Sequence, residues 1–525
     1  MADARDAVIA ELRQMNEQLG RLVAQQQAVI AAQQKLIGEL EQRLAERDAA
    51  HATRAEALEA EVRRLERELF GSKTERIKIP PPERDTGEGA ADEEQLARRR
   101  EEAARKRREN ALAKQQALAT DEAFYPVPDE QKCCPKCNGT RFGELKAETS
   151  TTIEYIPGRF VRRTHRREKL ACSCGECILV APSPPKLITG GQYGFGFAAF
   201  LIVEKCVDSI PIHRIERRFQ RLGIPISRAT MNDILHAAAE RARPLIARLQ
   251  KRVAALDIVL ADETSMRLQD RKTRGFIWVF HGRDENTSGE LALYVFAVDR
   301  SGETPAQILG GTRGTLVVDG YTGYNNVTDP EGRARGGCWS HLRRKLFEAR
   351  TEAGDLADIG IGKIRGLFRV EHEATAIGIV GTPEHLALRQ DRSKPIVDDF
   401  FAWAEANKGA ILPKSPLAAA LGYALNQRKR LELFLSDPRI PIHNNSSERR
   451  LRVVALGRKN FLFFGNPRAG RNIAGLYSLV GSCIANRVEP TEYLTDVLAR
   501  VHDGTTDDEL DALLPDRWRP LGPAP

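Results

Sequence analysis

The chain has 525 residues, and its 80 Lys and Arg residues outnumber its 72 Asp and Glu residues by 8. Single hydrophobic cores stop growing at about 250–300 residues, so this length predicts several domains. With 42% hydrophobic and 29% charged residues, the composition excludes a membrane protein and a disordered one. No apolar run of about 18 residues and no signal-peptide pattern is present, so we expect a cytoplasmic or nucleoid-associated protein.

Residues 1–78 show the heptad pattern of a coiled coil. Apolar residues recur every seven positions at Val8, Met15, Leu22, Val29 and Leu36. A second seam passes through residues 12, 19, 26, 33 and 40, as the a and d positions of a zipper do. We predict a zipper that makes the protein a homo-oligomer; the alternative is one helix packed on its own globular domain. Residues 79–125 are rich in proline and charge, which predicts a charged linker.

Residues 126–182 contain two groups of cysteines with metal-ligand spacing. Two residues separate Cys134 from Cys137, and two separate Cys174 from Cys177. Four thiolates placed in this way can hold one Zn²⁺ in a tetrahedral site, although Cys172 could replace either member of the second pair. Because four thiolates leave no open coordination position, we expect a structural zinc site in a small β domain.

Basic residues near these cysteines and in the next segment point to DNA. The loop between the cysteine groups carries Arg162, Arg163, Arg166 and Arg167. In the predicted helical segment 183–250, a helix at Pro211–Arg221 is followed by a break and by Ser227, which can cap a second helix. Helical hairpins share this helix-turn-helix outline, but Arg217 and Arg218 favour contact with DNA phosphates.

Residues 251–485 have the pattern of an α/β core. One apolar run ends in Asp262 and another ends in Asp319. Between them we predict strands at 275–282 and 291–298 and a short helix at 304–309. Three strands, a helix and a fourth strand form the beginning of a ribonuclease-H-like sheet. If the first and fourth strands are adjacent and parallel, Asp262 and Asp319 meet at the strand ends, where α/β sheets bind ligands.

A third acid, Glu448, lies in the first turn of a helix that the preceding Asn and Ser residues are predicted to cap. Three carboxylates supply the oxygen ligands that Mg²⁺ or Mn²⁺ prefers. Two such ions about 4 Å apart can activate the attacking oxygen and stabilise the leaving oxygen in phosphodiester cleavage. Each acid also has a structural alternative, as a turn cap or as a partner of a helix dipole.

A series of ordered motifs resembles the insertion-sequence-66 transposase family. In chain order they are LFGSKTER at 69–76, the cysteine region, KCVDSIPI at 205–212, DET at 262–264, DGYTGY at 319–324, GCWSHLRRK at 337–345, NNSSER at 444–449 and GRKN at 457–460. The resemblance implies a DDE recombinase in which Asp262, Asp319 and Glu448 hold metal ions. Water or a DNA 3′ hydroxyl is then the nucleophile, without a covalent enzyme–DNA intermediate.

The resemblance also implies a helical insertion at about 355–437, which leaves residues 486–525 as a C-terminal tail. It implies that the protein acts on the terminal repeats of its element and on target DNA, with companion transposition proteins and no membrane. We predict phosphate contacts from four basic residues near the acids; solvated helix faces are the alternative for each. They are Arg343, Arg344, Arg458 and Lys459. The family commonly has Asp before Asn-Asn, where this chain has His443.

Together these features predict a multidomain α+β protein with a zipper, a zinc-binding β domain, a helical DNA-binding segment and a ribonuclease-H-like catalytic core. The predicted activity is cleavage at the 3′ ends of the element and strand transfer into target DNA. Two alternatives remain: a nuclease of the same fold that acts alone, and a zinc-containing DNA-binding regulator with an inactive core.

Overall fold

The computed structural model describes residues 160–171 and 178–520, apart from 271–273, 329, 331 and 410, together with isolated positions before residue 160. The isolated positions between 15 and 38 are helical. The rest of the predicted zipper, most of the linker and all five candidate zinc ligands lie outside the described residues. The chain divides into two compact units, Met1–Val161 and Arg162–Pro525. No described helix is long and apolar enough to cross a membrane.

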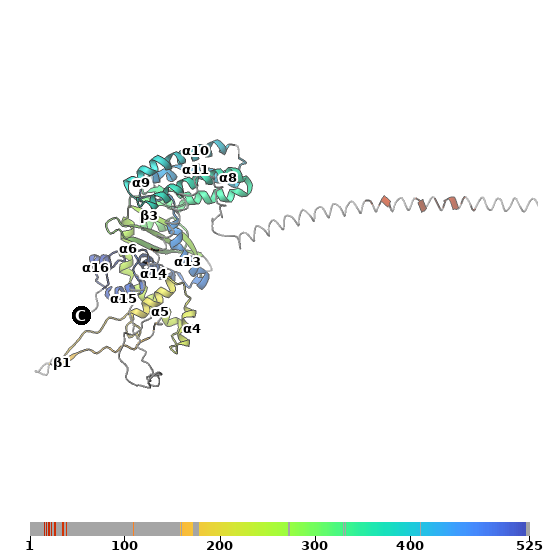
Figure 1. Cartoon of the computed structure of the whole chain (residues 1–525). Coiled ribbons are helices and arrows are strands. Elements are labelled where there is room, and N and C mark those ends of the chain that lie inside the picture. Colours follow the sequence, from red (N-terminus) through yellow and green to blue (C-terminus); the bar gives the residue numbers. More distant parts are fainter. Residues whose placement is uncertain are drawn as a thin grey trace, which may run out of the picture. The chain divides into compact units, whose positions relative to one another are not determined.

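A six-stranded mixed sheet forms the centre of the second unit (Figure 1). Its strands are β3 (Ile258–Leu268), β4 (Arg274–Arg283), β5 (Glu290–Ala297), β6 (Thr315–Val317), β7 (Ala334–Gly336) and β8 (Phe463–Phe464). The strand order is β5-β4-β3-β6-β7, and β8 pairs with the far end of β3. β4 runs antiparallel to both of its neighbours, whereas β6, β7 and β8 are parallel to the strands they pair with.

The predicted series of three strands, a helix and a fourth strand is present, since α7 (Glu303–Leu309) lies between β5 and β6. The first and fourth of these strands, β3 and β6, are adjacent and parallel, which confirms the predicted pairing. One expectation was wrong, because β3 does not end at Asp262. It continues to Leu268 because β4 keeps pairing with it beyond that residue, while β6 stops at Val317. Asp262 therefore lies inside β3, two residues beyond the last residue of that strand that pairs with β6.

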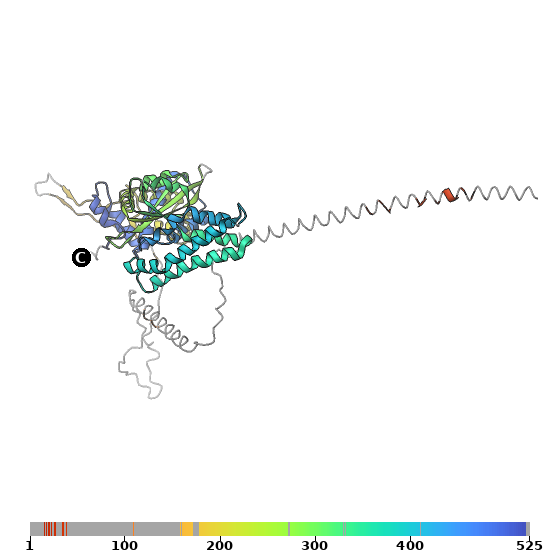
Figure 2. The ribbon, with the colours of Figure 1, turned by 90° about the horizontal axis from the view of Figure 1, so that it is seen from above.

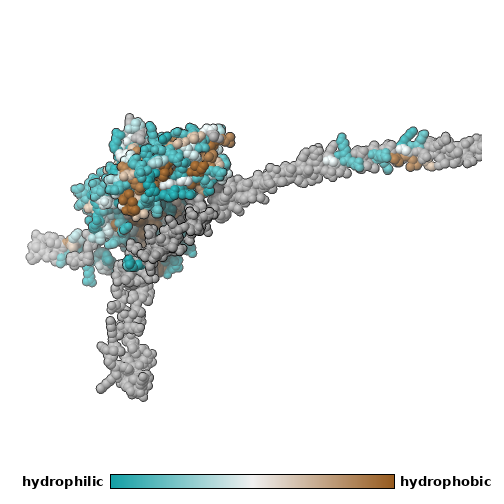
Figure 3. Space-filling view, turned by 45° about the horizontal axis from the view of Figure 1, so that its top comes forward, coloured by the Kyte–Doolittle hydropathy of each residue, from teal (hydrophilic) through white to brown (hydrophobic). Residues whose placement is uncertain are grey.

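A group of helices between the second and third acids covers one face of the sheet and stays together in two perpendicular views (Figures 1 and 2). It comprises α8 (Trp339–Ala376), α9 (Pro383–Leu388), the π-helix η3 (Arg389–Ser393), α10 (Lys394–Lys408), α11 (Pro416–Asn426), α12 (Arg428–Glu432) and the 3₁₀ helix η4 (Leu433–Leu435). Its buried side chains share one core with Leu260 and Val317 of the sheet. On the face in Figure 3, apolar patches interrupt a mainly hydrophilic surface.

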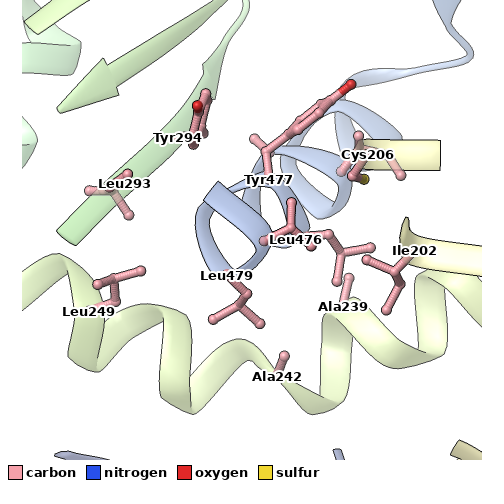
Figure 4. Packing of buried hydrophobic residues seen from close by; sticks show 14 of the residues in the cluster. Ile202, Cys206, Ala239, Ala242, Leu249, Leu293, Tyr294, Leu476, Tyr477 and Leu479 are labelled. Atoms are coloured by element: carbon pink, nitrogen blue, oxygen red, sulfur yellow. The ribbon is translucent and has the colours of Figure 1, made fainter. Parts of the chain in front are cut away.

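A second and larger core contains side chains from both faces of the sheet, because the consecutive β4 residues Ile277–Phe280 all belong to it. Its helices are α3 (Phe195–Cys206), α4 (Ile212–Arg221), α5 (Arg228–Arg241), α6 (Arg243–Ala255), α13 (Asn445–Phe461), α14 (Pro467–Ala485), α15 (Pro490–Arg500) and α16 (Asp507–Leu513). Figure 4 shows Leu476 and Leu479 of α14 packed among Leu249, Leu293 and Ala239. The segment from residue 486, which we expected to be a tail, contains α15 and α16, and both bury apolar side chains in this core.

The helix-turn-helix outline is present in α4 and α5. Ser227 caps α5 as predicted, because its hydroxyl accepts a hydrogen bond from the Thr230 N–H at 3.1 Å. The turn between the helices contains Gly223 at a φ of 72°, a conformation that glycine adopts without strain. A short antiparallel hairpin, β1 (Lys169–Ala171) and β2 (Ile178–Val180), precedes these helices.

Helix α14 protects the outer edge of the sheet with two serines. The Ser478 hydroxyl accepts a hydrogen bond from the Tyr294 N–H at 2.7 Å, and the Ser482 hydroxyl accepts one from the Ala292 N–H at 3.0 Å. Both serines are fully buried. Because an uncovered edge strand exposes unpaired backbone groups, these hydroxyls satisfy donors of β5 that would otherwise have no partner.

We expect Ser478→Ala to lower the free energy of unfolding by about 1–3 kcal/mol, because it leaves the Tyr294 N–H buried without an acceptor. The control is Ser393→Ala, since the Ser393 hydroxyl is buried without a hydrogen-bond partner among the described residues. Urea unfolding followed by tryptophan fluorescence measures the effect, because all four tryptophans lie between residues 278 and 518. Equal midpoints for the two variants would contradict the expectation.

Candidate functional site

Asp262 and Asp319 lie on the same side of the sheet. Successive side chains of a strand point to opposite faces, and the Leu260 and Val317 side chains share the core under the inserted helices. These two residues are partners in the β3–β6 register. Asp262 and Asp319 each follow two positions later, so continuation of the register places them side by side on the face that the inserted helices cover.

A buried hydrogen-bond network joins the helix of Glu448 to this strand. The Asn444 side-chain amide donates to the carbonyl of Ala261, the neighbour of Asp262, at 2.7 Å. The Ser447 hydroxyl donates to Asn444 Oδ1 at 2.6 Å and lies 2.9 Å from His281 Nε2. Because the single hydroxyl proton goes to Asn444, Nε2 of the histidine is the donor to Ser447. The first turn of α13 is thereby fixed against β3 and β4.

This network corrects the prediction that Asn444 caps the helix with its side chain. Asn444 occupies the N-cap position of α13, but its side chain makes no cap hydrogen bond. His443 lies one position earlier, where its Nδ1 accepts the Asn445 N–H at 3.4 Å. Its ring stacks on Phe368 with 5.6 Å between centroids, and burial lowers its pKa. A neutral histidine thus supplies a hydrogen-bond acceptor at the start of α13.

The three acids act on one another electrostatically. Burial raises the pKa of Asp262 to about 7, and the negative charges of Glu263, Asp319 and Glu448 add to this effect. The Glu263 N–H donates to Asp262 Oδ1 at 2.9 Å, which opposes the rise. Burial is thus the main cause of the raised pKa of Asp262, and the charges of the other acids are smaller contributions.

The acids do not form a closed coordination shell as their side chains stand. Within the described ranges, no three His, Cys, Asp or Glu side chains come close enough together to hold a metal ion. Glu448 Oε1 is paired instead with Arg344 Nη2 at 3.2 Å. Asp319 Oδ1 accepts the N–H of Tyr321 at 2.9 Å, in a local turn. The Glu448–Arg344 ion pair therefore competes with metal ligation by Glu448 Oε1.

Glu263 is a buried acid that the sequence analysis did not single out. Its side chain is 2% exposed, and it accepts hydrogen bonds from the Tyr324 hydroxyl at 2.8 Å and from Arg300 Nε at 2.7 Å. Strand alternation was the available signal, because an acid that directly follows Asp262 in a buried strand must face the opposite core. Glu263 therefore belongs to the packing of the DGYTGY motif rather than to the face of Asp262.

A buried arginine holds the loop that carries Asp319. Arg335 donates to the carbonyls of Asp319 at 2.7 Å and Tyr321 at 2.6 Å, and to the side chain of Asn325 at 2.6 Å. Burial lowers the pKa of Arg335 to about 10, and the charge of Arg430 adds to the effect. One side chain thus fixes three acceptors of this loop, a role that no local sequence pattern predicts.

The basic residues that we predicted to bind DNA fall into two groups. The exposed ones are Arg162, Arg163, Arg166, Arg167, Arg217, Arg344 and Lys459, whereas Arg218, Arg343 and Arg458 are half-buried. Several of these residues are held by protein partners, among them Arg167, whose Nη1 donates to the Ala181 carbonyl at 3.1 Å. Arg218 pairs with Glu204 at 2.7 Å, Arg344 pairs with Glu448, and Arg458 Nη1 donates to the Ser265 carbonyl at 2.5 Å. Arg458 thereby satisfies a backbone acceptor of β3.

Comparison with protein families identifies the chain. Residues 190–472, more than half of the chain, match the model described as "Transposase IS66 family". The chain belongs to the IS66 transposase family. Residues 478–515 match the IS66 C-terminal element, and residues 131–175 match the zinc-finger binding domain of transposase IS66. The zinc-finger match includes Cys134, Cys137, Cys172 and Cys174 and ends before Cys177.

Relatives of this IS66-family chain occur in Sinorhizobium fredii (strain NBRC 101917 / NGR234). The protein named "Uncharacterized protein y4hP" is 28% identical over 505 residues, which cover 88% of this chain and 89% of that protein. "Uncharacterized protein y4qI" is 30% identical over 400 residues, which cover 73% and 74% respectively. "Uncharacterized protein y4jD" is 28% identical over 489 residues, which cover 88% and 94%.

We expect Asn444→Ala to loosen the first turns of α13, because it leaves the buried Ala261 carbonyl and Ser447 hydroxyl without their partner. Hydrogen exchange of the amides at 445–452 should become about tenfold faster. The matched control is Asn407→Ala, which removes only a bond to the Trp403 carbonyl within its own helix. If exchange in α13 stays unchanged in Asn444→Ala, the network does not fix this helix.

Proposed function

We propose that this IS66-family chain is a DNA transposase of an insertion sequence. In this proposal it binds the ends of its element, cleaves a phosphodiester bond at each 3′ end and joins that end to target DNA. The observation that supports the proposal is the link between the elements that carry Asp262, Asp319 and Glu448. Asp262 and Asp319 each follow a member of the Leu260–Val317 pair by two positions, and Asn444 bonds the start of the Glu448 helix to Ala261.

The sheet supports a ribonuclease-H-like core for this activity. Its order of β5-β4-β3-β6-β7, with β4 antiparallel to its neighbours, has the parallel first and fourth strands that the sequence predicted. In an open α/β sheet, ligands bind at the carboxyl ends of the parallel strands. Asp262 and Asp319 lie there because β6 ends two residues before Asp319.

The donor set fits divalent metal ions. Asp262, Asp319 and Glu448 offer only carboxylate oxygens, and the raised pKa of Asp262 marks a region where a cation would offset negative charge. Two Mg²⁺ or Mn²⁺ ions, when bound, activate the attacking oxygen and stabilise the leaving oxygen. Arg344 is paired with Glu448. We infer that a DNA phosphate draws Arg344 away and so releases Glu448 for ligation.

The other groups of the site position these acids. The Asn444, Ser447 and His281 network fixes the start of α13, and Arg335 fixes the loop of Asp319. Glu263 stays on the opposite face because Tyr324 and Arg300 hold its carboxylate. The ligands are therefore attached to a strand, to a loop fixed by a buried arginine and to a helix, which limits their movement to the side chains.

For the zinc domain we propose that Cys134 and Cys137 bind Zn²⁺ with two cysteines of the second group. Cys174 and Cys177 have the two-residue spacing, whereas the family match favours Cys172 and Cys174 because it ends at residue 175. Zinc would then fix the fold around the exposed arginines 162–167, which suits binding of element ends. DNA ends and target DNA, the coiled-coil homo-oligomer and companion transposition proteins belong to the same proposal.

One observation favours a second candidate function, a zinc-containing DNA-binding regulator with an inactive core. No three candidate ligands lie at ligating distance in the described part of the chain. This reading predicts that substitution of the acids leaves the function unchanged, whereas the transposase requires all three.

We expect Asp262→Asn, Asp319→Asn and Glu448→Gln each to slow Mg²⁺-dependent cleavage by more than about a hundredfold, because loss of a ligand should exceed the effect of losing a supporting group. DNA binding should persist. Gel assays on DNA that flanks the gene measure both properties. The control is Asp270→Asn, an exposed acid after β3. Cleavage by the triad variants at the wild-type rate would support the regulator instead.

We expect Cys134→Ser and Cys137→Ser to abolish zinc binding, because three thiolates hold the ion much less tightly than four. Atomic absorption on the purified protein measures the zinc content. Cys133→Ser is the matched control, since it lies beside Cys134 but outside the spacing. The same measurement on Cys172→Ser, Cys174→Ser and Cys177→Ser identifies the second pair; full zinc in Cys134→Ser and Cys137→Ser would exclude these ligands.

A further inference from the structure

The segment that follows Glu448 is strongly basic. Residues 449–488 contain no Asp or Glu, although the whole chain has about one acid in every seven residues. The same segment carries Arg449, Arg450, Arg452, Arg458, Lys459, Arg468, Arg471 and Arg487. A surface formed by this segment repels acidic partners and attracts polyanions.

Helix α13 sorts these residues by face. Leu451, Val454 and Gly457 are buried, whereas exposed residues follow at intervals of three or four positions. The exposed residues are Arg449, Arg452, Leu456 and Lys459. This spacing places them in one stripe along the helix. We call these four residues the α13 stripe; it begins directly after Glu448.

The basic residues of the α13 stripe have no ion-pair partner among the residues that the structure describes. The arginines on the other faces of α13 are engaged with the protein: Arg450 with Glu290 and Arg458 with the carbonyl of Ser265. Arg449, Arg452 and Lys459 therefore present their charge to solvent, and Glu448 is the one acid of their helix. Such residues suit a row of phosphates.

The α13 stripe ends at two exposed apolar side chains, Leu462 and Phe463. Leu462 is 60% exposed and has a φ of 64°, a region that glycine favours and that strains a leucine. Phe463 is 37% exposed. The residues on either side are anchored, since Phe464 is buried against Phe296 and Phe461 lies under the Lys205 ammonium group. The backbone thus holds two apolar side chains outward at a fixed place.

We propose that the α13 stripe follows the backbone of duplex DNA and that Leu462, with Phe463, inserts between base pairs as an apolar wedge. This inference rests on the proposed function, because DNA is the occupant. Proteins that distort DNA insert Leu or Phe between base steps while basic residues hold the flanking phosphates. Charge favours DNA over an apolar protein partner here. The exposed apolar residue Ile377, just after α8, lies between Glu373 and Glu384 and lacks such an acid-free segment.

The sheet gives the distance from the wedge to the acids. Phe463 pairs with Arg267, which follows Asp262 by five residues on the same strand. At about 3.3 Å per residue, the wedge lies about 17 Å from Asp262. DNA rises about 3.4 Å per base pair, so the distortion should occur about five base pairs from the phosphodiester bond that is cleaved.

The test of the wedge uses full-length protein without divalent metal, so that it depends on binding and not on cleavage. Duplexes with the flanking end sequence carry 2-aminopurine at one position after another, and fluorescence reports unstacking. We expect a several-fold rise about five base pairs from the cleaved bond, which Leu462→Gly abolishes. Glycine also relieves the strained φ, so this variant should unfold at an equal or higher urea concentration. The control is Leu412→Gly, an exposed leucine of the insertion.

The test of the α13 stripe is Arg452→Glu, which should weaken binding at least tenfold and reduce the slope of log K against log salt by about one or more. Its control is Arg365→Glu, an equal charge change at an exposed position of α8. A fluorescence rise that persists in Leu462→Gly overturns the wedge, and wild-type affinity in Arg452→Glu overturns the stripe. If the wild-type chain binds no DNA, the proposed function fails first and the inference fails with it.

Discussion

The site depends on one buried hydrogen bond, from the Asn444 side chain to the carbonyl of Ala261. It joins the strand of Asp262 to the helix of Glu448 across 183 positions of sequence. Ser447 and His281 complete the contact, and all three polar side chains are almost fully buried. A buried polar network is costly when one member is lost, so it fixes a single arrangement of strand and helix. The same anchor sets the direction of α13 and hence the course of its exposed basic stripe.

Strand alternation places the consecutive acids Asp262 and Glu263 on opposite faces of the sheet. Asp262 faces the inserted helices, where burial and other carboxylates raise its pKa, whereas Glu263 faces the larger core and is neutralised by Arg300 and Tyr324. A one-residue shift of β3 would exchange these environments. Its antiparallel register with β4, fixed over eight pairs from Leu260 to Arg267, prevents that shift. Asp262 and Asp319 therefore lie on one face, and helix α13, which has no acid after Glu448, begins beside them.

Sequence reasoning predicted the order of the core elements because each is a short local pattern. Apolar runs and turn residues indicated the strands β3 to β6, the possible pairing of β3 with β6 and the Ser227 cap. Features that depend on distant partners were missed: the extension of β3 by β4, the burial of α15 and α16, and the use of Asn444 against Ala261 rather than as a cap. For the same reason the sequence alone suggests that Arg458 is a surface residue, whereas in the structure it donates to the Ser265 carbonyl. The candidate zinc ligands lie outside the described residues.

A long insertion between the second and third acids is compatible with a rigid site because the chain leaves and returns at one place. The Trp339 N–H, at the start of α8, donates to the carbonyl of Ile442 at 2.9 Å, and the Gly337 N–H donates to the carbonyl of Arg430 at 2.8 Å. Trp339 itself is buried, and its indole N–H donates to the Leu431 carbonyl at 2.9 Å. These bonds close the insertion at its base. Helices can therefore vary above this base without changing the distance between β7 and α13, and the positions of Asp319 and Glu448 do not depend on the length of the chain between them.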